Sequence, residues 1–382
     1  MDEQGYPLDR AAGHIAIVMH DFSTGGSERI AIRLANQWVR AGRRVTIFCG
    51  DATGPARVLV DPAISVIGVW PEIRRSPLSR IVLGHALAAC VHRVEPDLIF
   101  APGNFHIAVV GVLGRLAGPR RPPIVCKLSN PLKREGRSPV VQGVFARIIR
   151  LLIKPVDAFV AMSASLADEA REVLRRPGIH LIHEPNIDAG FTPPRDMGLR
   201  DGRTILCAGR LVGQKNFELA IKAFARIDSA LDARLLILGE GERRTKLETL
   251  VDRLGLNDRV HFAGHVPDIR PALARASLFL LSSRYEGYPA VVIEALAARL
   301  PVVATDCSPA MSEIMSEPGF GHVVDADPAA LAEAMEAVLR NPGPPVDASR
   351  LVDRHRADAV AGRYLVLFDA LVQARQGSSS MA

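Results

Sequence analysis

The sequence has few aromatic residues, few cysteines and no long apolar run. Aromatic residues make up 5% of the 382 residues, and no aromatic platform lies among the cations. We therefore expect no nucleic-acid partner. The five cysteines, at positions 49, 90, 126, 207 and 307, show no metal-ligand spacing. They are typical of buried free thiols in a reducing compartment.

Two further absences concern membranes. No uninterrupted apolar run approaches the length that spans a bilayer. Residues 1–13 are polar and acidic, where a signal peptide needs a charged start and an apolar core. We expect a cytoplasmic protein. Its charge distribution further indicates a location at the inner face of the cell membrane.

What the chain does contain is a repeated alternation of short apolar strands with helical patterns. A length of 382 residues with 48% hydrophobic content favours two domains. The predicted strands fall into two series that flank a polar, proline-rich connector, Phe191 to Arg203. The first series is Ile15–Met19, Val45–Cys49, Leu98–Phe100, Ile124–Val125 and Phe159–Met162. The second series is Thr204–Ala208, Leu235–Leu238, Val260–Ala263, Leu278–Leu281 and Val302–Thr305.

This alternation predicts an α/β fold with two doubly wound parallel sheets. We expect an N-terminal domain over residues 1–195 and a second domain over 196–360. Residues 361–382 are expected to form a helix that packs back toward the N-terminal domain and ends in a disordered Ser-rich tail.

Two glutamates frame the most informative segment. Glu286 lies in a loop opened by Gly287 and Pro289, and Glu294 lies in the helix that follows, Ala290 to Arg299. Carboxylates accept hydrogen bonds from sugar hydroxyls, while N–H groups at a helix start can meet phosphate oxygens. The pair therefore indicates a nucleotide-sugar site, although two solvated glutamates remain the alternative.

Two cations follow the strand Thr204–Ala208. Arg210 and Lys215 stand with Gly209 and Gly213 at the carboxyl end of that strand, where α/β sheets bind ligands. A guanidinium and an ammonium at this place can neutralise a diphosphate that gains charge as its sugar departs. Surface cations that merely cap a helix are the alternative.

At this point the chain resembles the retaining glycosyltransferases of family four, which have the GT-B fold of two Rossmann-like domains facing a cleft. The resemblance covers nearly the whole chain. It rests on Gly25-Gly26-Ser-Glu-Arg, Gly209-Arg-Leu-Val-Gly-Gln-Lys-Asn, Leu238-Gly-Glu-Gly-Glu, and Glu286-Gly-Tyr-Pro with Glu294.

The resemblance implies that Arg210 and Lys215 hold the donor diphosphate, that Glu286 contacts the donor sugar and that Glu294 binds the ribose. We expect Arg210, Lys215 and Glu286 to be catalytic. The expected donor-binding set is Gly26, Gly209, Arg210, Lys215, Gly287, Tyr288, Pro289 and Glu294. No metal or other cofactor is implied. Asp325 and Asp327 look like a metal-binding acidic pair, but Asp327 is better explained as a helix N-cap before Pro328.

The acceptor side departs from the family pattern. Many members carry a histidine after the strand that matches Ile124–Lys127, but this chain has Ser129 and Asn130 there. Asn130 can hydrogen-bond a sugar hydroxyl but cannot act as a base. His106 is the other acceptor-side candidate, and a packed or solvated histidine is an equal alternative.

Basic residues concentrate in the N-terminal half, with 25 Lys or Arg against 17 Asp or Glu in residues 1–195. Between Arg115 and Lys154, ten cations meet one acid, Glu135. Eight apolar residues are interleaved, namely Val140, Val141, Val144, Phe145, Ile148, Ile149, Leu151 and Leu152. Such a segment is typical of a helix on an anionic membrane. A helix whose apolar side packs in the core is the alternative that we favour for the apolar residues.

These features together predict a retaining hexosyltransferase. It would move a sugar from a nucleoside diphosphate, UDP or GDP, to a hydroxyl of a lipid-linked or cell-envelope glycan. Since both glutamates are assigned to hydroxyl binding, no nucleophile remains, and we favour same-face attack with the departing phosphate accepting the proton. The alternatives are a nucleotide-sugar epimerase or glycan phosphorylase of the same fold, and a non-catalytic membrane-associated binding protein.

Overall fold

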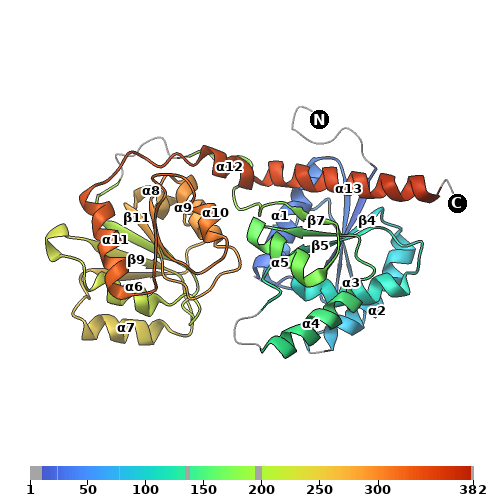
Figure 1. The fold of residues 1–382 in the computed structure, drawn as a ribbon, viewed down its shortest axis with the longest axis horizontal. Coiled ribbons are helices and arrows are strands. Elements are labelled where there is room, and N and C mark those ends of the chain that lie inside the picture. Colours follow the sequence, from blue (N-terminus) through green and yellow to red (C-terminus); the bar gives the residue numbers. More distant parts are fainter. Residues whose placement is uncertain (1–10, 24, 77, 134–137, 194–199, 380–382) are drawn as a thin grey trace. The chain divides into compact units, whose positions relative to one another are not determined.

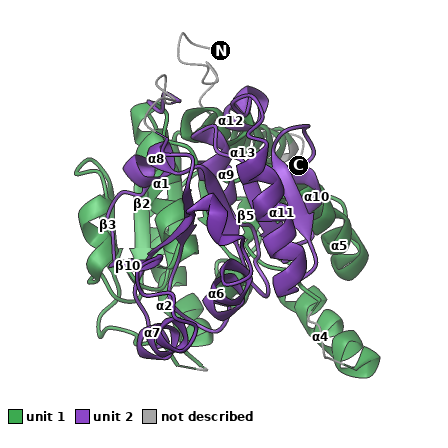
Figure 2. Ribbon diagram, turned by 90° about the vertical axis from the view of Figure 1, so that its left-hand side faces the viewer, with its two compact units in different colours: residues 1–189, 354–382 green, residues 190–353 purple. Residues whose placement is uncertain are grey.

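The chain forms two compact units, each built on one parallel sheet (Figure 1). The computed structural model describes residues 11–23, 25–76, 78–133, 138–193 and 200–379. Unit 1 comprises residues 1–189 and 354–382, and unit 2 comprises residues 190–353 (Figure 2). The sequence predicts domain boundaries after residues 195 and 360. In the structure the chain passes from unit 1 to unit 2 after residue 189 and returns to unit 1 after residue 353, so both boundaries fall a few residues earlier than expected. Residues 194–199 of the predicted connector lie outside the described residues.

The sheet of unit 1 has seven strands in the order β3-β2-β1-β4-β5-β6-β7, and every neighbouring pair is parallel. Their bounds are β1 His14–Met19, β2 Arg44–Cys49, β3 Ser65–Gly68, β4 Leu98–Ala101, β5 Ile124–Leu128, β6 Ala158–Ala161 and β7 Ile179–Leu181. The chain runs outward from β1 in one direction and from β4 in the other. The carboxyl ends of these two strands therefore flank the topological switch point, where such sheets bind ligands.

Helices cover both faces of this sheet (Figure 1). They are α1 Gly26–Arg40, α2 Ser79–Val94, α3 Ile107–Leu116, α4 Pro139–Leu152, α5 Ala164–Leu174 and α13 Ala357–Ser379, with short 3₁₀ turns η1 Pro55–Leu59 and η2 Asn104–His106. Helix α12, Ser349–His355, contains the second crossing between the units.

The C-terminal helix α13 packs into the core of unit 1. Trp38 of α1 contacts the rings of Tyr364 and Phe368 edge-on, with centroids 6.0 and 5.1 Å away. Asp369 accepts a hydrogen bond from the Ala12 backbone at 2.8 Å and pairs with the buried Arg43 at 2.7 Å. The helix extends through Ser379, so the part of the Ser-rich tail before residue 380 is helical, not disordered as expected.

The sheet of unit 2 has six parallel strands in the order β10-β9-β8-β11-β12-β13. Their bounds are β8 Thr204–Ala208, β9 Arg234–Leu238, β10 Val260–Gly264, β11 Leu278–Leu281, β12 Val302–Thr305 and β13 Gly321–Val324. The helical elements are α6 Phe217–Phe224, η3 Ser229–Leu231, α7 Arg244–Arg253, α8 Arg270–Arg275, α9 Ala290–Ala297, α10 Met311–Ile314 and α11 Pro328–Arg340. Strands β8 and β11 are neighbours, and their carboxyl ends flank the switch point of this sheet.

Three strands were not predicted from the sequence: β3, β7 and β13. Each lies at an edge of its sheet and is only partly buried. An edge strand lacks a neighbour on one side and is less thoroughly covered, so it does not need the continuous apolar run that marks a central parallel strand. By contrast, the predicted cap of α11 is confirmed, since Asp327 accepts hydrogen bonds from the backbone of Ala329 at 2.8 Å and Ala330 at 3.0 Å.

Helix α4 corrects one expectation. Its apolar residues were expected to pack in the core, but five of the eight are exposed: Val140, Val141, Val144, Ile148 and Leu151. Of the other three, Ile149 is buried, and Phe145 and Leu152 are half-buried. In the part of the chain that the structure describes, no helix is both long enough and apolar enough to cross a membrane.

Candidate functional site

The loops that follow β8 and β9 in unit 2 are joined through their backbones. Gly209 follows β8 with φ +155°, and Gly239 follows β9 with φ +139°. A Cβ at Gly239 would lie 1.9 Å from the carbonyl oxygen of Gly209, so only glycine permits this approach. The backbone of Leu211 donates to the Glu240 carbonyl at 2.8 Å and fixes the start of the loop that carries Lys215.

Lys215 contacts Glu286, the residue that opens the second predicted segment. The Nζ atom of Lys215 lies 2.6 Å from Oε1 of Glu286, and the two side chains are 20% and 9% exposed. The structure therefore brings together two residues that the sequence assigns to different parts of one ligand. An ammonium has three N–H donors, so this contact leaves Lys215 able to donate to a further acceptor.

Two other side chains position the Glu286 carboxylate. The hydroxyl of Ser283 donates to Oε1 at 2.7 Å, and the amide of Gln214 lies 3.4 Å from Oε2. Gln214 also donates to the Tyr285 carbonyl at 3.0 Å. These contacts hold the carboxylate in one orientation at the ends of β8 and β11.

The backbone of this loop is tied to the segment after β12. The Glu286 N–H donates to the Cys307 carbonyl at 2.7 Å, and the Ser308 hydroxyl donates to the Gly287 carbonyl at 3.2 Å. Burial raises the pKa of the Cys307 thiol to about 12, and the nearby carboxylate of Glu286 adds to the shift. Cys307 therefore stays protonated at neutral pH and acts here through its backbone.

Gly287, Tyr288 and Pro289 lead directly into α9. Pro289 is buried and occupies the N-cap position, so the chain turns sharply from the Glu286 loop into the helix. Val292, Ile293, Ala295 and Leu296 are buried around Glu294, which is itself half-buried. Glu294 therefore lies in the second turn of α9, the helix that follows the Glu286 loop.

Arg210, the remaining cation of the predicted set, follows Gly209 and is exposed. Among the residues that the structure describes, no acidic group lies within ion-pair distance of its side chain. Its charge is therefore uncompensated at the end of β8, whereas that of Lys215 is shared with Glu286.

The predicted residues of unit 1 lie on the loops after β1, β4 and β5. Gly26 is the first residue of α1, and a Cβ there would meet nothing within 4 Å. Its neighbour Gly25 is the constrained glycine, because a Cβ at Gly25 would lie 2.2 Å from Oε2 of Glu28. A side chain at Gly25 therefore requires the Glu28 carboxylate to shift, whereas Gly26 leaves open space at the helix start.

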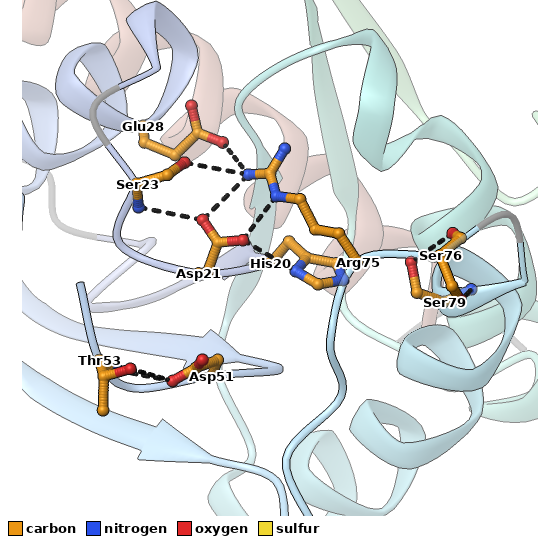
Figure 3. A network of polar contacts seen from close by, with 9 residues as sticks. All are labelled: His20, Asp21, Ser23, Glu28, Asp51, Thr53, Arg75, Ser76 and Ser79. Atoms are coloured by element: carbon orange, nitrogen blue, oxygen red, sulfur yellow. Dashed lines mark hydrogen bonds and ion pairs between the residues drawn. The ribbon is translucent and has the colours of Figure 1, made fainter.

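Glu28 belongs to a charged network at the ends of β1 and β3 (Figure 3). Arg75 donates to Glu28 at 2.7 Å and to both carboxylate oxygens of Asp21 at 2.5 and 3.0 Å. Burial opposes ionisation of Asp21, but hydrogen bonds from Arg75 and Ser23 outweigh it and hold the pKa of Asp21 well below its usual value. Asp21 is thus anionic at any physiological pH.

The two acceptor-side candidates differ in exposure. The ring of His106 is fully buried, and neither of its nitrogens has a partner among the described residues. Burial, with the charges of Arg75 and His20, lowers the pKa of His106 to about 3. Asn130 is exposed, and its side-chain amide donates to the Ser129 hydroxyl at 3.2 Å, while its backbone carbonyl accepts from the Asn104 side chain at 2.7 Å. As placed here, Asn130 reaches solvent and His106 does not.

Comparison with known families decides what kind of protein carries these sites. The family described as glycosyl transferases group 1 matches residues 202–341, and the glycosyl transferase 4-like domain matches residues 25–184. The chain belongs to the group 1 glycosyltransferases. The matched ranges contain the Lys215–Glu286 pair and the glycine pair of α1, respectively.

Two curated relatives of this glycosyltransferase have names that refer to exopolysaccharide and to the lipopolysaccharide core. It is 32% identical over 261 residues to the exopolysaccharide phosphotransferase SCO2592 of Streptomyces coelicolor, covering 66% of this chain and 27% of that protein. It is 26% identical over 369 residues to the lipopolysaccharide core biosynthesis glycosyltransferase LpsD of Rhizobium meliloti, covering 94% and 99%. The chain spans between 27% and 54% of the first curated relatives that it matches.

The glycosyltransferase also superposes on solved structures. HepE from Anabaena, in complex with UDP, matches with a TM-score of 0.69 at 20% identity, covering 97% of this chain and 100% of that one. Together with the two parallel sheets, this likeness establishes the GT-B fold.

Sequence reasoning missed Ser283, Gln214 and the Arg75 network of this glycosyltransferase. Serine and glutamine are common at surfaces, so their identity carries little information. Position is the available signal, because Ser283 follows β11 almost directly and the carboxyl ends of parallel strands carry ligands. Arg75 lies in a loop with no predicted strand before it, since β3 was not recognised.

Proposed function

We propose that this glycosyltransferase moves a hexose-type sugar from a UDP- or GDP-linked donor to a hydroxyl of a lipid-linked or cell-envelope glycan, with retention of anomeric configuration. The observation that carries the proposal is the Lys215–Glu286 contact of 2.6 Å at the ends of β8 and β11. A cation and an oriented carboxylate at one point match the two halves of such a donor, its diphosphate and its sugar hydroxyls.

Each predicted site residue of unit 2 then has a defined role in donor binding. Lys215 and Arg210 bind the diphosphate, and Glu286 accepts hydrogen bonds from the donor sugar. Glu294 accepts from the ribose hydroxyls, while backbone groups of Gly287, Tyr288 and Pro289 lie beside the sugar and phosphate. Gly209 leaves room for the diphosphate at the end of β8.

The reaction breaks the bond between the anomeric carbon and the diphosphate oxygen and forms a bond to the acceptor oxygen on the same face. The acceptor hydroxyl gives its proton to the departing phosphate. Charge develops on the leaving group, so Arg210 and Lys215 stabilise the transition state more than the ground state. In this proposal Glu286 binds a sugar hydroxyl and is not the nucleophile, and Lys215 and Ser283 hold its Oε1 as a hydrogen-bond acceptor.

The acceptor binds to unit 1 in this proposal. Asn130 offers an exposed amide to a sugar hydroxyl. The basic excess of residues 1–195 suits an anionic membrane surface that presents a lipid-linked acceptor, on the cytoplasmic side. Names that refer to lipopolysaccharide core and exopolysaccharide among the relatives support an envelope glycan.

A panel of nucleoside diphosphate sugars tests the proposal. A bound ligand raises thermal stability according to the ratio of its concentration to its dissociation constant, so one donor should raise the melting temperature above all others. That donor should then be consumed only when a glycan acceptor is added, and chelation of divalent cations by EDTA should not slow the reaction. No stabilisation by any donor, or turnover with inorganic phosphate alone, would contradict the proposal.

A further inference from the structure

Helix α4 presents an apolar stripe to solvent. Val140, Val141, Val144, Ile148 and Leu151 are each between 51% and 76% exposed. At about 100° per residue, these five positions fall within an arc of about 100° on the helix surface. A continuous apolar stripe of this kind is unusual on a water-exposed helix and marks a binding surface.

The opposite side of α4 is firmly packed. Ala146 and Ile149 are buried, and Arg150 donates to the Val173 carbonyl at 2.9 Å. A Cβ at Gly111 of α3 would lie 2.6 Å from the Leu152 carbonyl, so α3 and α4 touch backbone to backbone. In Figure 2, α4 projects from the body of unit 1. The helix is anchored, and its exposed stripe is a fixed feature.

The charges on α4 are all positive. Residues 139–154 contain Arg147, Arg150 and Lys154 and no acidic residue. Arg147 lies at the border of the stripe by the same angular count, and Lys154 follows the helix end. Both are exposed, and neither has an acidic partner within ion-pair distance in the described ranges. The stripe is therefore flanked by cations that the fold leaves unneutralised.

We propose that α4 lies in the interface of an anionic phospholipid bilayer. Its stripe enters the boundary between headgroups and acyl chains, and Arg147 and Lys154 contact lipid phosphates. With 14 residues, α4 is about 21 Å long, so it lies in the membrane plane and does not span. The inference rests on the proposed function in one respect: docking brings the protein to the membrane that carries its proposed lipid-linked acceptor.

Charge argues against a second copy of the chain as the occupant. A two-fold contact through this stripe would bring two copies of Arg147 and Lys154 together, with no acidic residue on either helix to offset them. An anionic bilayer supplies that opposite charge.

Vesicle sedimentation with the full chain tests the docking. The test variant is Val144→Ser/Ile148→Ser, whose residues are 55% and 52% exposed. The matched control is Ile81→Ser/Val82→Ser on α2, where the same two residue types are 52% and 50% exposed. Each variant is measured on phosphatidylcholine vesicles with and without phosphatidylglycerol, and its thermal unfolding is recorded to establish that it is folded.

We expect the wild type to bind the anionic vesicles and not the neutral ones. The α4 variant should bind at least about tenfold more weakly, because buried methyl groups are lost, and the α2 control should bind as the wild type. An Arg147→Ser/Lys154→Ser variant should lose about thirtyfold on anionic vesicles, since each cation contributes roughly a fivefold change in affinity.

Four results would overturn the inference: no vesicle binding, equal binding to neutral and anionic lipid, an equal loss in the α2 control, or a dimer in sedimentation velocity that the α4 variant abolishes. Calorimetry with UDP and GDP on the same proteins separates this inference from the proposed function. Vesicle binding without nucleotide binding supports the docking and removes the donor chemistry, whereas nucleotide binding without vesicle binding does the reverse.

Discussion

Lys215 lies 2.6 Å from the carboxylate of Glu286 although the two residues are 71 positions apart in the sequence. They meet because β8 and β11 are neighbours in the sheet of unit 2 and because each residue follows the carboxyl end of its strand. Ser283 and Gln214 complete the surroundings of the carboxylate. Lys215 and Glu286 are therefore the first residues to test by substitution.

Replacing either cation should weaken diphosphate binding. Charge-assisted contacts contribute about 1.5–3 kcal/mol, so Lys215→Ala and Arg210→Ala should each reduce affinity for UDP or GDP by at least about tenfold, with slower turnover. Titration calorimetry with the free nucleotides measures this directly. Lys246→Ala is the control, because Lys246 is an exposed cation elsewhere in unit 2. If both site variants bind nucleotide as the control does, the phosphate site lies elsewhere.

The two glutamates should separate binding from transfer. Glu286→Gln keeps the shape of the side chain but removes the charge that pairs with Lys215, so sugar transfer should fall by at least about tenfold while nucleotide affinity is nearly kept. Glu294→Gln should instead weaken nucleotide binding, since ribose hydroxyls donate to this carboxylate in the proposed site. Calorimetry and initial rates on both variants decide the matter. If each variant changes nucleotide affinity and transfer rate equally, the two glutamates do not have separate roles.

Substitutions at the two glycines at the start of α1 should have different effects, one on stability and the other on sugar transfer. In Gly25→Ala, the new Cβ would overlap Glu28, whose carboxylate is held by Arg75 at 2.7 Å, so we expect a loss of about 1–3 kcal/mol in unfolding free energy. Gly26→Ala meets open space and should unfold as the wild type, yet it should transfer sugar more slowly if the donor approaches this loop.

Denaturant unfolding followed by tryptophan fluorescence measures both glycine variants. The chain has two tryptophans, Trp38 and Trp70, and both belong to unit 1. Wild-type stability in Gly25→Ala would show that Glu28 moves aside at little cost. Wild-type transfer rates in Gly26→Ala would exclude the donor from this loop.

His106, one of several buried histidines of unit 1, should make that unit less stable in acid. The pKa of His106 is lowered by burial from 6.5 to about 3. Between these pH values the unfolded chain binds a proton that the folded unit rejects, so stability is full above pH 6.5 and declines as the pH falls toward 3. The limiting slope is about 1.4 kcal/mol per pH unit for one group.

A His106→Leu variant tests this contribution. The loss of unfolding free energy between pH 8 and pH 5, followed by tryptophan fluorescence, should be smaller in the variant than in the wild type. The value at pH 8 serves as the reference, because the histidine is neutral in both states there. An identical pH dependence in the two proteins would mean that His106 is protonated in the folded unit or reaches solvent.

The central strands were predictable, but of the four edge strands only β10 was. Strands β1, β4, β8 and β11 are covered on both faces, so almost every residue must be apolar, and the run is visible in the sequence. Strands β3, β7 and β13 are partly exposed and carry no such run. Arg75 was missed for the same reason, because its loop follows β3.

The apolar content of α4 was visible in the sequence, but its direction was not. The same residues serve a core helix or a surface helix, and periodicity does not say which face meets the protein. Only the packing of Ala146 and Ile149 against neighbouring helices turns Val144 and Ile148 to solvent. The membrane inference therefore depends on tertiary structure, although its cations are plain in the sequence.

The sequence by itself determined the fold class, the two-unit organisation and the residue types of the proposed donor site. It could do so because burial on both faces of a parallel strand demands apolar residues, and because ligand-binding loops follow such strands. The tertiary structure decided which side chains meet. The pairing of Lys215 with Glu286 depends on strand order, and the burial of His106 depends on how its loop packs. Contacts between distant segments leave no local pattern for a sequence to reveal.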